Sequence, residues 1–294
     1  MKELMLYELS NLTFSYAGVG TKVLHVKDLI IPRRKIVVIL GLSGIGKSTL
    51  LESLGLMNNT VIQNDETVFR FYGKGNGEFI DFSKIWARKS DLVLSDIRNK
   101  HFSFIFQDTN LMPNFSVIEN VIVTLMIQGF SNKKARNLAM EYMEKIGIGD
   151  IDPNKKVFEL AGGQRQRIAF IRAICPDFTV LLGDEPTGNL DRFNSRNLMQ
   201  ILQENIHEKK GSAIIVSHDI DLSVEFADQL IIIRKQTDNN QGAELSYGLI
   251  EQGSIYNLNI KEGKKYWKNG KESYEDETMK QLIRRNLGTQ KITD

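Results

Sequence analysis

The stretch Gly41-Leu-Ser-Gly-Ile-Gly-Lys-Ser-Thr49 fits the pattern G-x-x-x-x-G-K-[ST] and determines which class of fold we expect. It follows the β-branched run Ile36-Val-Val-Ile-Leu40, which predicts a buried strand, and it precedes residues 48–56, which favour a helix. In such a loop, backbone N–H groups and the positive end of the helix surround phosphate groups. We expect Lys47 to reach the β- and γ-phosphates in binding and catalysis, and Ser48 to bind Mg²⁺. The residues predicted to contact the nucleotide in this loop are Gly41, Ser43, Gly44, Gly46, Lys47, Ser48 and Thr49.

A second motif, Val180-Leu-Leu-Gly-Asp-Glu185, is an apolar run that ends in two acidic residues. If the run forms a parallel strand, the carboxylates lie at the carboxyl edge of the sheet, beside a bound nucleotide. We expect Asp184 to hold the Mg²⁺ shell and Glu185 to polarise the attacking water, because phosphoryl transfer depends on positioning and charge stabilisation. An acidic pair is equally common at a solvated strand end, so these two motifs alone indicate only an NTPase with a phosphate loop.

A third motif narrows the class of NTPase. In Leu160-Ala-Gly-Gly-Gln-Arg-Gln-Arg167, two glycines precede a predicted helix and form a second nest of backbone N–H groups. An anion site that faces outward implies a nucleotide held by another subunit. Together with Gly183-Asp-Glu-Pro-Thr-Gly-Asn-Leu-Asp191, this run resembles the signature, Walker B and D-loop motifs of ABC (ATP-binding cassette) ATPases. The resemblance covers about residues 4–234.

The resemblance implies that ATP, with Mg²⁺, lies between the phosphate loop of one subunit and the signature of a second. It assigns stacking on adenine to Tyr16, the Q-loop role in metal binding and catalysis to Gln107, and contact with the γ-phosphate to His218. The residues that it assigns to contacts across the dimer are Ala161, Gly162, Gly163, Gln164 and Asp191. Taken singly, a tyrosine in a β segment is usually a core residue and a lone histidine usually has no ligand.

Ala161 stands where the family has a signature serine. One hydrogen bond to the partner's γ-phosphate is therefore expected to be absent, which would weaken the closed dimer by about 1 to 2 kcal/mol. Slower or asymmetric hydrolysis would follow. A regulatory ABC subunit that binds ATP with little hydrolysis is one alternative function.

The segments 95–107 and 110–121 resemble the lipoprotein-release, macrolide-efflux and cell-division group of ABC ATPases. In that group, ATPase dimers drive permeases that have long extracytoplasmic domains. The resemblance implies a second ABC ATPase subunit, as a homodimer, and a separate integral membrane permease as partners. It places the chain at the cytoplasmic face of the inner membrane as a peripheral protein that contacts the membrane through the permease. The substrate cannot be read from these motifs.

Composition excludes several other classes of function. The net charge of +2 gives no overall attraction to nucleic acid, so we expect no nucleic-acid partner. The lone cysteine, Cys175, excludes an internal disulfide and predicts core packing. No run approaches the ~20 apolar residues of a spanning helix, and acidic residues interrupt the first nine positions, so we expect neither a pore nor a secretory signal. One rival function is a non-transport ABC ATPase that acts on ribosomes or DNA, but the sequence has no second cassette and no strongly basic face. Another is a P-loop kinase or GTPase, but the sequence has no guanine-specific motif.

The order of predicted elements gives an α/β fold: a P-loop NTPase cassette of the ABC type with a mixed, mainly parallel sheet, an N-terminal antiparallel β part and a helical subdomain. We expect an ABC ATPase domain over residues 1–234, with the helical subdomain at about 113–163 ending in the signature, and a C-terminal extension over 235–294. Residues 60–95 predict a strand pair joined by a flexible turn. The extension is polar and lysine-rich, and residues 261–271 combine lysines with Tyr266 and Trp267, a composition that also fits contact with a permease or with lipid head groups. We expect instead a solvated, partly disordered tail, whose deletion over residues 259–294 leaves dimerisation and turnover intact.

Overall fold

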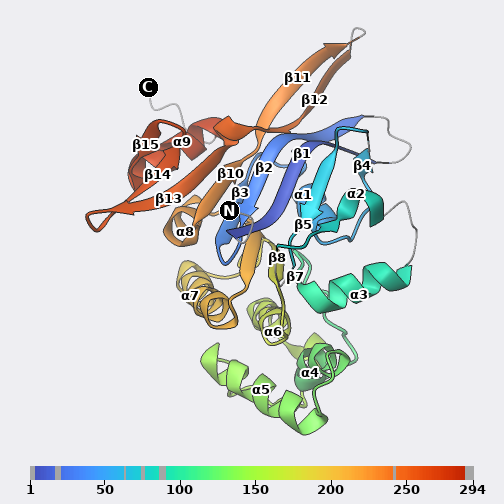
Figure 1. The fold of residues 1–294 in the computed structure, drawn as a ribbon. Coiled ribbons are helices and arrows are strands. Elements are labelled where there is room, and N and C mark those ends of the chain that lie inside the picture. Colours follow the sequence, from blue (N-terminus) through green and yellow to red (C-terminus); the bar gives the residue numbers. More distant parts are fainter. Residues whose placement is uncertain are drawn as a thin grey trace. The chain divides into compact units, whose positions relative to one another are not determined.

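A computed structural model describes residues 4–16, 21–62, 64–73, 77–85, 91–240 and 243–288. The chain forms two compact units, of which unit 1 combines Met1–Leu94 with Ile214–Asp294 and unit 2 is Ser95–Ala213. Figure 1 shows both units and labels most of their helices and strands. Among the described helices, none combines the length and the apolar character that crossing a membrane requires.

One sheet of unit 1 is built around the paired strands β1 (Met5–Ser15) and β2 (Lys22–Pro32). These run antiparallel, and β5 (Val68–Phe71) pairs antiparallel with the other edge of β1. The predicted N-terminal antiparallel part is confirmed. The order of its described strands is β11-β12-β2-β1-β5-β6, with β4 (Val61–Ile62) beside β1. Tyr7 of β1 is fully buried and donates its hydroxyl to the carbonyl of Leu54 at 2.8 Å, which ties this sheet to helix α1 (Lys47–Leu54).

The second sheet of unit 1 contains the strand that leads into the phosphate loop. β3 (Ile36–Leu40) is buried along its whole length and pairs in parallel with β10 (Gln229–Ile232). Strand β13 (Ile255–Lys261) then pairs antiparallel with β10, followed in space by β14 (Lys264–Asn269) and β15 (Glu272–Tyr274). β3 is thus a buried parallel strand followed by the glycine loop and helix α1, as the sequence predicts.

Unit 2 contains most of α3 (Asp91–His101), a parallel strand pair and the helices α4 to α7. β7 (Phe102–Ile105) pairs with β8 (Val180–Asp184). Helices α4 (Val117–Ile127), α5 (Asn132–Lys145), α6 (Gly162–Ile174) and α7 (Arg192–Lys209) follow the chain, with a 3₁₀ turn at Val157–Glu159 before α6. β9 (Ser212–Val216) carries the chain from unit 2 back into unit 1.

The carboxyl end of α6 is capped by a side chain from α7. The ammonium of Lys209 donates to the carbonyls of Ile174, Cys175 and Pro176 at 2.7 to 2.8 Å. Because the last carbonyls of a helix have no partner within it, this cation stabilises the end of α6. Cys175 is 2% exposed, as predicted for core packing, and burial raises the pKa of its thiol.

The structure differs from the sequence prediction over residues 60–95. β5 and β6 (Ile80–Asp81) do pair antiparallel, but α2 (Phe82–Ile85) and α3 (Asp91–His101) replace the rest of the expected strand pair. Leu94, Ile97 and His101 are all buried and recur with the spacing of one helical face. The period is obscured in the sequence because Leu92 and Val93 are apolar but exposed, whereas His101 is polar but buried.

The prediction of a disordered tail is wrong for the described residues 243–288. They form β12 (Ala243–Ile250), β13, β14, β15 and helix α9 (Asp276–Asn286). β11 (Arg234–Asn240) and β12 pair with each other, and β12 lies parallel to β2. Gly248 of β12 packs on the carbonyl of Ile45 in the phosphate loop so closely that a Cβ would collide with it. The extension is therefore part of the folded unit 1.

Trp267 on β14 is fully buried and donates its indole N–H to a carboxylate oxygen of Asp276 at 3.0 Å. We therefore expect Trp267→Ala to lower the free energy of unfolding by about 3 to 5 kcal/mol, because the substitution leaves a large cavity. Urea denaturation measures the change, with the exposed Lys268→Ala on the same strand as the control. A loss equal to that of the control would mean that the extension is not packed as described.

Candidate functional site

The phosphate loop of unit 1 has the backbone that a phosphate cradle requires. Gly44 and Gly46 have φ values of 72° and 100°, in the left-handed region that favours glycine. A Cβ on Gly46 would lie 3.1 Å from the Cβ of Leu24, whereas the space over Gly44 is open to 4 Å. Helix α1 begins at Lys47 with no side-chain cap, so its first N–H groups point into the loop.

The ammonium of Lys47 folds back onto the loop. It donates to the carbonyls of Gly41 and Leu42 at 3.0 and 2.9 Å, and the residue is 6% exposed. The neighbouring Ser48 is exposed on the first turn of α1. The buried ammonium of Lys47 and the exposed hydroxyl of Ser48 lie next to each other at the phosphate loop, and this pair suits a polyphosphate with a bound metal ion.

Tyr16, predicted to stack on adenine, contacts the same helix. Its hydroxyl lies 2.9 Å from the hydroxyl of Thr49, and its side chain is partly exposed. This places the aromatic ring at the end of the phosphate loop. Stacking on a base stays a prediction.

In unit 2, Asp184 ends β8 and Glu185 follows it in a tight turn. Glu185 has φ of 49°, a left-handed conformation that costs energy for a residue with a side chain. Its carbonyl accepts the N–H of Gly188 at 3.1 Å. Both carboxylates are partly exposed, so the strained turn presents them at the carboxyl end of the strand.

The signature motif lies at the open beginning of α6. Ala161 is the N-cap residue, and it offers no side-chain oxygen to the first N–H groups of the helix. Gln164 accepts the N–H of Ala161 at 3.0 Å, and the space over Gly162 is open to 4 Å. The N–H groups at this helix start are available to an external anion.

Asp191 is the N-cap of α7, a role that the sequence interpretation missed. Its carboxylate accepts the N–H of Asn194 at 2.9 Å, and this bond holds the pKa of Asp191 below its ordinary value. An aspartate directly before a helix is a signal for such a cap. Contact with a second subunit stays a prediction for this exposed residue.

His218 and Gln107 are both exposed at strand ends. His218 follows β9 in unit 1, and Gln107 follows β7 in unit 2. The structure thus brings Lys47, Ser48 and Tyr16 together in unit 1. Within unit 2, a leucine side chain of the D-loop, Leu190, approaches Gly163 of the signature, since a Cβ there would lie 3.3 Å from it.

No group of three or more His, Cys, Asp or Glu side chains able to hold a metal ion occurs in the described part of the chain. The predicted Mg²⁺ ligands are instead a hydroxyl, an amide and one carboxylate, from Ser48, Gln107 and Asp184. Mg²⁺ commonly takes few protein ligands together with phosphate and water oxygens, so this donor set suits magnesium bound with a nucleotide.

The profile of the ABC transporter family matches residues 24–188. The chain belongs to the ABC transporter family. Its cassette is 34% identical over 206 residues to the lipoprotein-releasing system ATP-binding protein LolD of Pseudoalteromonas translucida, an alignment that covers 68% of this chain and 80% of LolD. It is 35% identical over 212 residues to LolD of Francisella tularensis, which covers 71% of this chain and 85% of that protein.

A longer relative is the macrolide export ATP-binding/permease protein MacB of Aggregatibacter actinomycetemcomitans. The identity is 35% over 222 residues, or 74% of this chain, but the chain spans only 32% of the length of MacB. Among solved structures, the dimeric ATP-binding cassette MJ0796 in a post-hydrolysis state with ADP and Pi matches with a TM-score of 0.65 and 27% identity, over 77% of this chain and 94% of that one. The chain is an ABC-type ATPase, and the predicted ABC cassette fold is confirmed.

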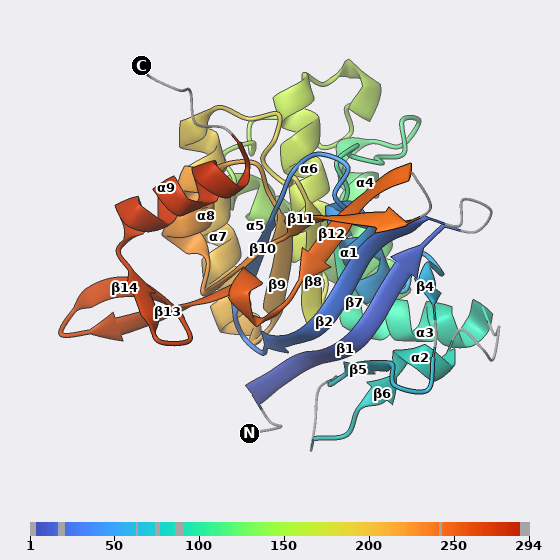
Figure 2. The ribbon, with the colours of Figure 1, turned by 90° about the horizontal axis from the view of Figure 1, so that it is seen from above.

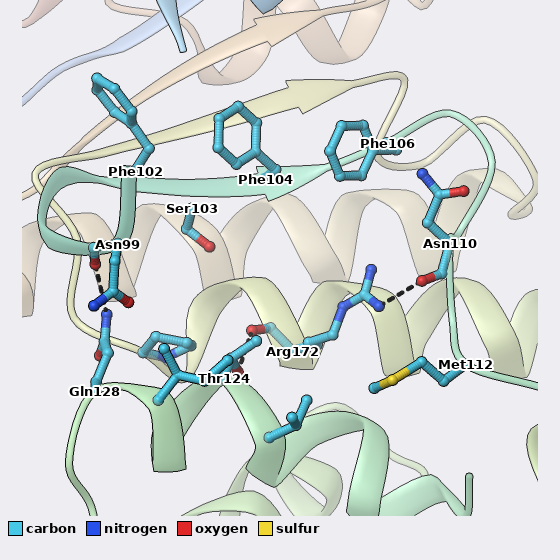
Figure 3. A pocket seen from close by; sticks show the side chains of 13 residues that line it. Asn99, Phe102, Ser103, Phe104, Phe106, Asn110, Met112, Thr124, Gln128 and Arg172 are labelled. Carbon is cyan, nitrogen blue, oxygen red and sulfur yellow. Dashed lines mark hydrogen bonds between the residues drawn. The ribbon is translucent and has the colours of Figure 1, made fainter. Parts of the chain in front are cut away.

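Two residues of the ABC cassette that sequence reasoning missed lie on the signature helix. Arg172 of α6 donates to the carbonyls of Thr109 and Asn110 at 2.8 and 2.7 Å, directly after the Q-loop glutamine, as Figure 3 shows for Asn110. Gln166 donates to the carbonyl of Pro186 at 2.8 Å, directly after Glu185. Helix α6 therefore connects the signature to both neighbouring motifs. The available signal was the position of these two polar residues within a helix that is otherwise largely buried, which indicates that they bond to neighbouring segments.

Arg172→Met is expected to lower the free energy of unfolding by about 1.5 to 3 kcal/mol, because two bonds from a charged donor are lost. Burial lowers the pKa of the guanidinium, so the substitution also removes the cost of desolvating that charge, which offsets part of the loss. We further expect slower ATP hydrolysis, because Gln107 loses its support. Urea denaturation and single-turnover hydrolysis measure the two effects, and the exposed Lys133→Met on α5 is the control. Hydrolysis at the control's rate would contradict the proposed support.

Proposed function

We propose that this ABC ATPase closes as a homodimer around two ATP molecules, each held between the phosphate loop of one copy and the signature of the other. The uncapped, open start of α6 at Ala161 and Gly162 is the observation that carries the proposal. A helix start that faces solvent binds an anion best when the anion is supplied from outside. The MJ0796 cassette, a dimer bound to ADP and Pi, supports a nucleotide-bound dimer.

Each predicted residue has a proposed role in this arrangement. The residues proposed to contact ATP are Tyr16, Gly41, Ser43, Gly44, Gly46, Lys47, Ser48, Thr49, Ala161, Gly162, Gly163, Gln164 and Asp191. The ligands proposed for Mg²⁺ are Ser48, Gln107 and Asp184, and the catalytic residues are Glu185, His218, Gln107 and Lys47. Mg²⁺ would neutralise charge that develops on the phosphate oxygens. Glu185 would orient the attacking water, and Lys47 would stabilise the γ-phosphate.

We further propose that hydrolysis drives a separate integral membrane permease at the cytoplasmic face of the inner membrane. The LolD relatives, named for a lipoprotein-releasing system, and MacB, named for macrolide export, support this placement. On this proposal residues 1–234 form the ATPase domain, residues 113–163 its helical subdomain, and residues 235–294 an addition to it. The identity of the permease sets the substrate.

A cavity in unit 2 supports the proposal that a partner protein binds there. It has a volume of about 470 Å³ and is bounded by strand β7, helix α4 and Arg172 (Figure 3). Phe104 and Phe106 stack beside it with ring centroids 5.6 Å apart, and Ile127 is 64% exposed at its edge. A largely apolar cavity with one cation at its base suits a short amphipathic segment of a partner. We propose that the permease inserts such a segment here, next to the carbonyls that Arg172 holds.

Glu185→Gln tests the dimer that the proposal requires. The variant should bind Mg²⁺-ATP, fail to hydrolyse it, and accumulate as a closed dimer, because the proposed water-orienting carboxylate is lost while the phosphate contacts stay. Size-exclusion chromatography with light scattering, with and without ATP, measures the dimer. Lys47→Ala is the matched control and should stay monomeric. A monomeric Glu185→Gln at saturating ATP would contradict the ATP sandwich.

Ala161→Ser tests the missing hydroxyl at the signature. We expect the added hydroxyl to strengthen the ATP-bound dimer of Glu185→Gln by about 1 to 2 kcal/mol, or about fivefold to thirtyfold in its dissociation constant. Sedimentation of the double variant measures this constant, and Ala161→Gly is the control without a hydroxyl. Equal dimerisation by serine and glycine would show that position 161 does not face the partner's phosphate. Raised hydrolysis by Ala161→Ser alone would explain any slow turnover of the natural chain.

A further inference from the structure

The loop that carries His218 is fixed to the start of helix α8 (Ile220–Phe226). Before the histidine, the N–H of Ser217 donates to the carbonyl of Ile39 at 3.3 Å. After it, Asp219 caps α8 by accepting the N–H of Leu222 at 2.9 Å, and its own N–H donates to the hydroxyl of Ser217 at 3.0 Å. The position of His218 therefore follows the position of the first turn of α8.

Helix α8 is too short to be stable by itself. It has seven residues, and an isolated helix of that length does not form in water. Leu222, Val224 and Phe226 are buried, so packing keeps α8 in place. An element that packs on α8 therefore affects the position of the histidine loop from its C-terminal side.

Helix α9 of the C-terminal extension packs beside α8, as Figure 2 shows. The ammonium of Lys280 lies 3.2 Å from a carboxylate oxygen of Asp221, and the guanidinium of Arg284 lies 3.9 Å from the same oxygen. Asp221 belongs to the first turn of α8, three residues after His218. Two cations of α9 thus contact the first turn of α8, which directly follows the loop that carries His218.

The position of α9 does not depend on these ion pairs alone. Met279 and Ile283 are fully buried, and Asp276 at its start accepts the indole N–H of Trp267. The extension is joined to the cassette through the pairing of β13 with β10, in which Tyr256 lies opposite Leu230. Because α9 is held in place by its own buried contacts, it can determine the position of the shorter helix α8 that packs on it.

We propose that α9 positions the switch histidine, with Lys280 and Arg284 acting through Asp221 on the first turn of α8. The inference rests on the role of His218 at the γ-phosphate in the proposed function. It gives the segment beyond residue 235 a place in ATP hydrolysis. Lys280 and Arg284 are positioning residues, and they affect the reaction only through the placement of His218.

The double variant Lys280→Gln, Arg284→Gln removes both cations and keeps the buried face of α9. We expect its single-turnover hydrolysis rate to fall on the order of tenfold, because a small displacement of a group at the reacting phosphate is costly. The dissociation constant for Mg²⁺-ATP and the melting temperature should stay at the wild-type values. Lys145→Gln is the matched control, since it removes a surface ion pair with Glu204 of similar length, 3.1 Å, and should leave the rate unchanged.

A comparison in the His218→Ala background separates positioning from a general loss of structure. If α9 acts through the histidine, the two glutamines should change the remaining rate by less than about twofold once the histidine is gone. Rates that fall by the same factor in both backgrounds would overturn the inference, as would an unchanged rate in the wild-type background. Asp221→Asn removes the same link from α8 and must show the same pattern, which keeps the test decisive if the double variant unfolds.

The His218→Ala variant also separates the proposed role of His218 in hydrolysis from the proposed role of α9 in positioning it. If His218→Ala hydrolyses ATP at the wild-type rate, the proposed role of His218 fails, and the inference fails with it. If His218→Ala is impaired while the double variant and Asp221→Asn are normal, the proposed function stands and only the role of α9 is overturned.

Discussion

Two helix starts without side-chain caps, those of α1 and α6, are the feature on which the rest of the site depends. The first N–H groups of a helix lack intrahelical partners, and their summed dipole attracts anions. At α1 a buried lysine and left-handed glycines add to that attraction. At α6 the start is open over Gly162, and no hydroxyl from residue 161 occupies it. On the proposed function, the phosphates of ATP would supply negative charge to both helix starts.

Helix α6 unites the functional residues of unit 2. Its start is the signature, Gln166 holds the turn after Glu185, and Arg172 holds the segment after Gln107. Lys209 caps its other end. A movement of α6 would therefore displace the segments that follow Glu185 and Gln107 at the same time. The cavity at which we propose that the permease docks is lined by Arg172 of the same helix.

The phosphate loop, the acidic strand and the signature were predictable because their chemistry depends on local spacing and backbone conformation. Gly46 illustrates this, since its φ of 100° follows from the loop and excludes other residues. The fold of the extension was not predictable in the same way. Trp267 is buried in a part of the fold that joins the cassette through the pairing of β13 with β10, two strands far apart in the sequence. Arg172 and Lys280 were missed for a similar reason, because their partners belong to other elements, and a polar residue on a helix does not by itself show which element it contacts.

The most direct test of the central claim is the dependence of ATP hydrolysis on protein concentration. With each ATP shared between two copies, the initial rate at saturating Mg²⁺-ATP should rise with the square of the concentration while most of the protein is monomeric, and become linear once the dimer saturates. A rate that is linear from the lowest concentration, with the protein monomeric throughout, would contradict the account, because one copy would then be sufficient for hydrolysis.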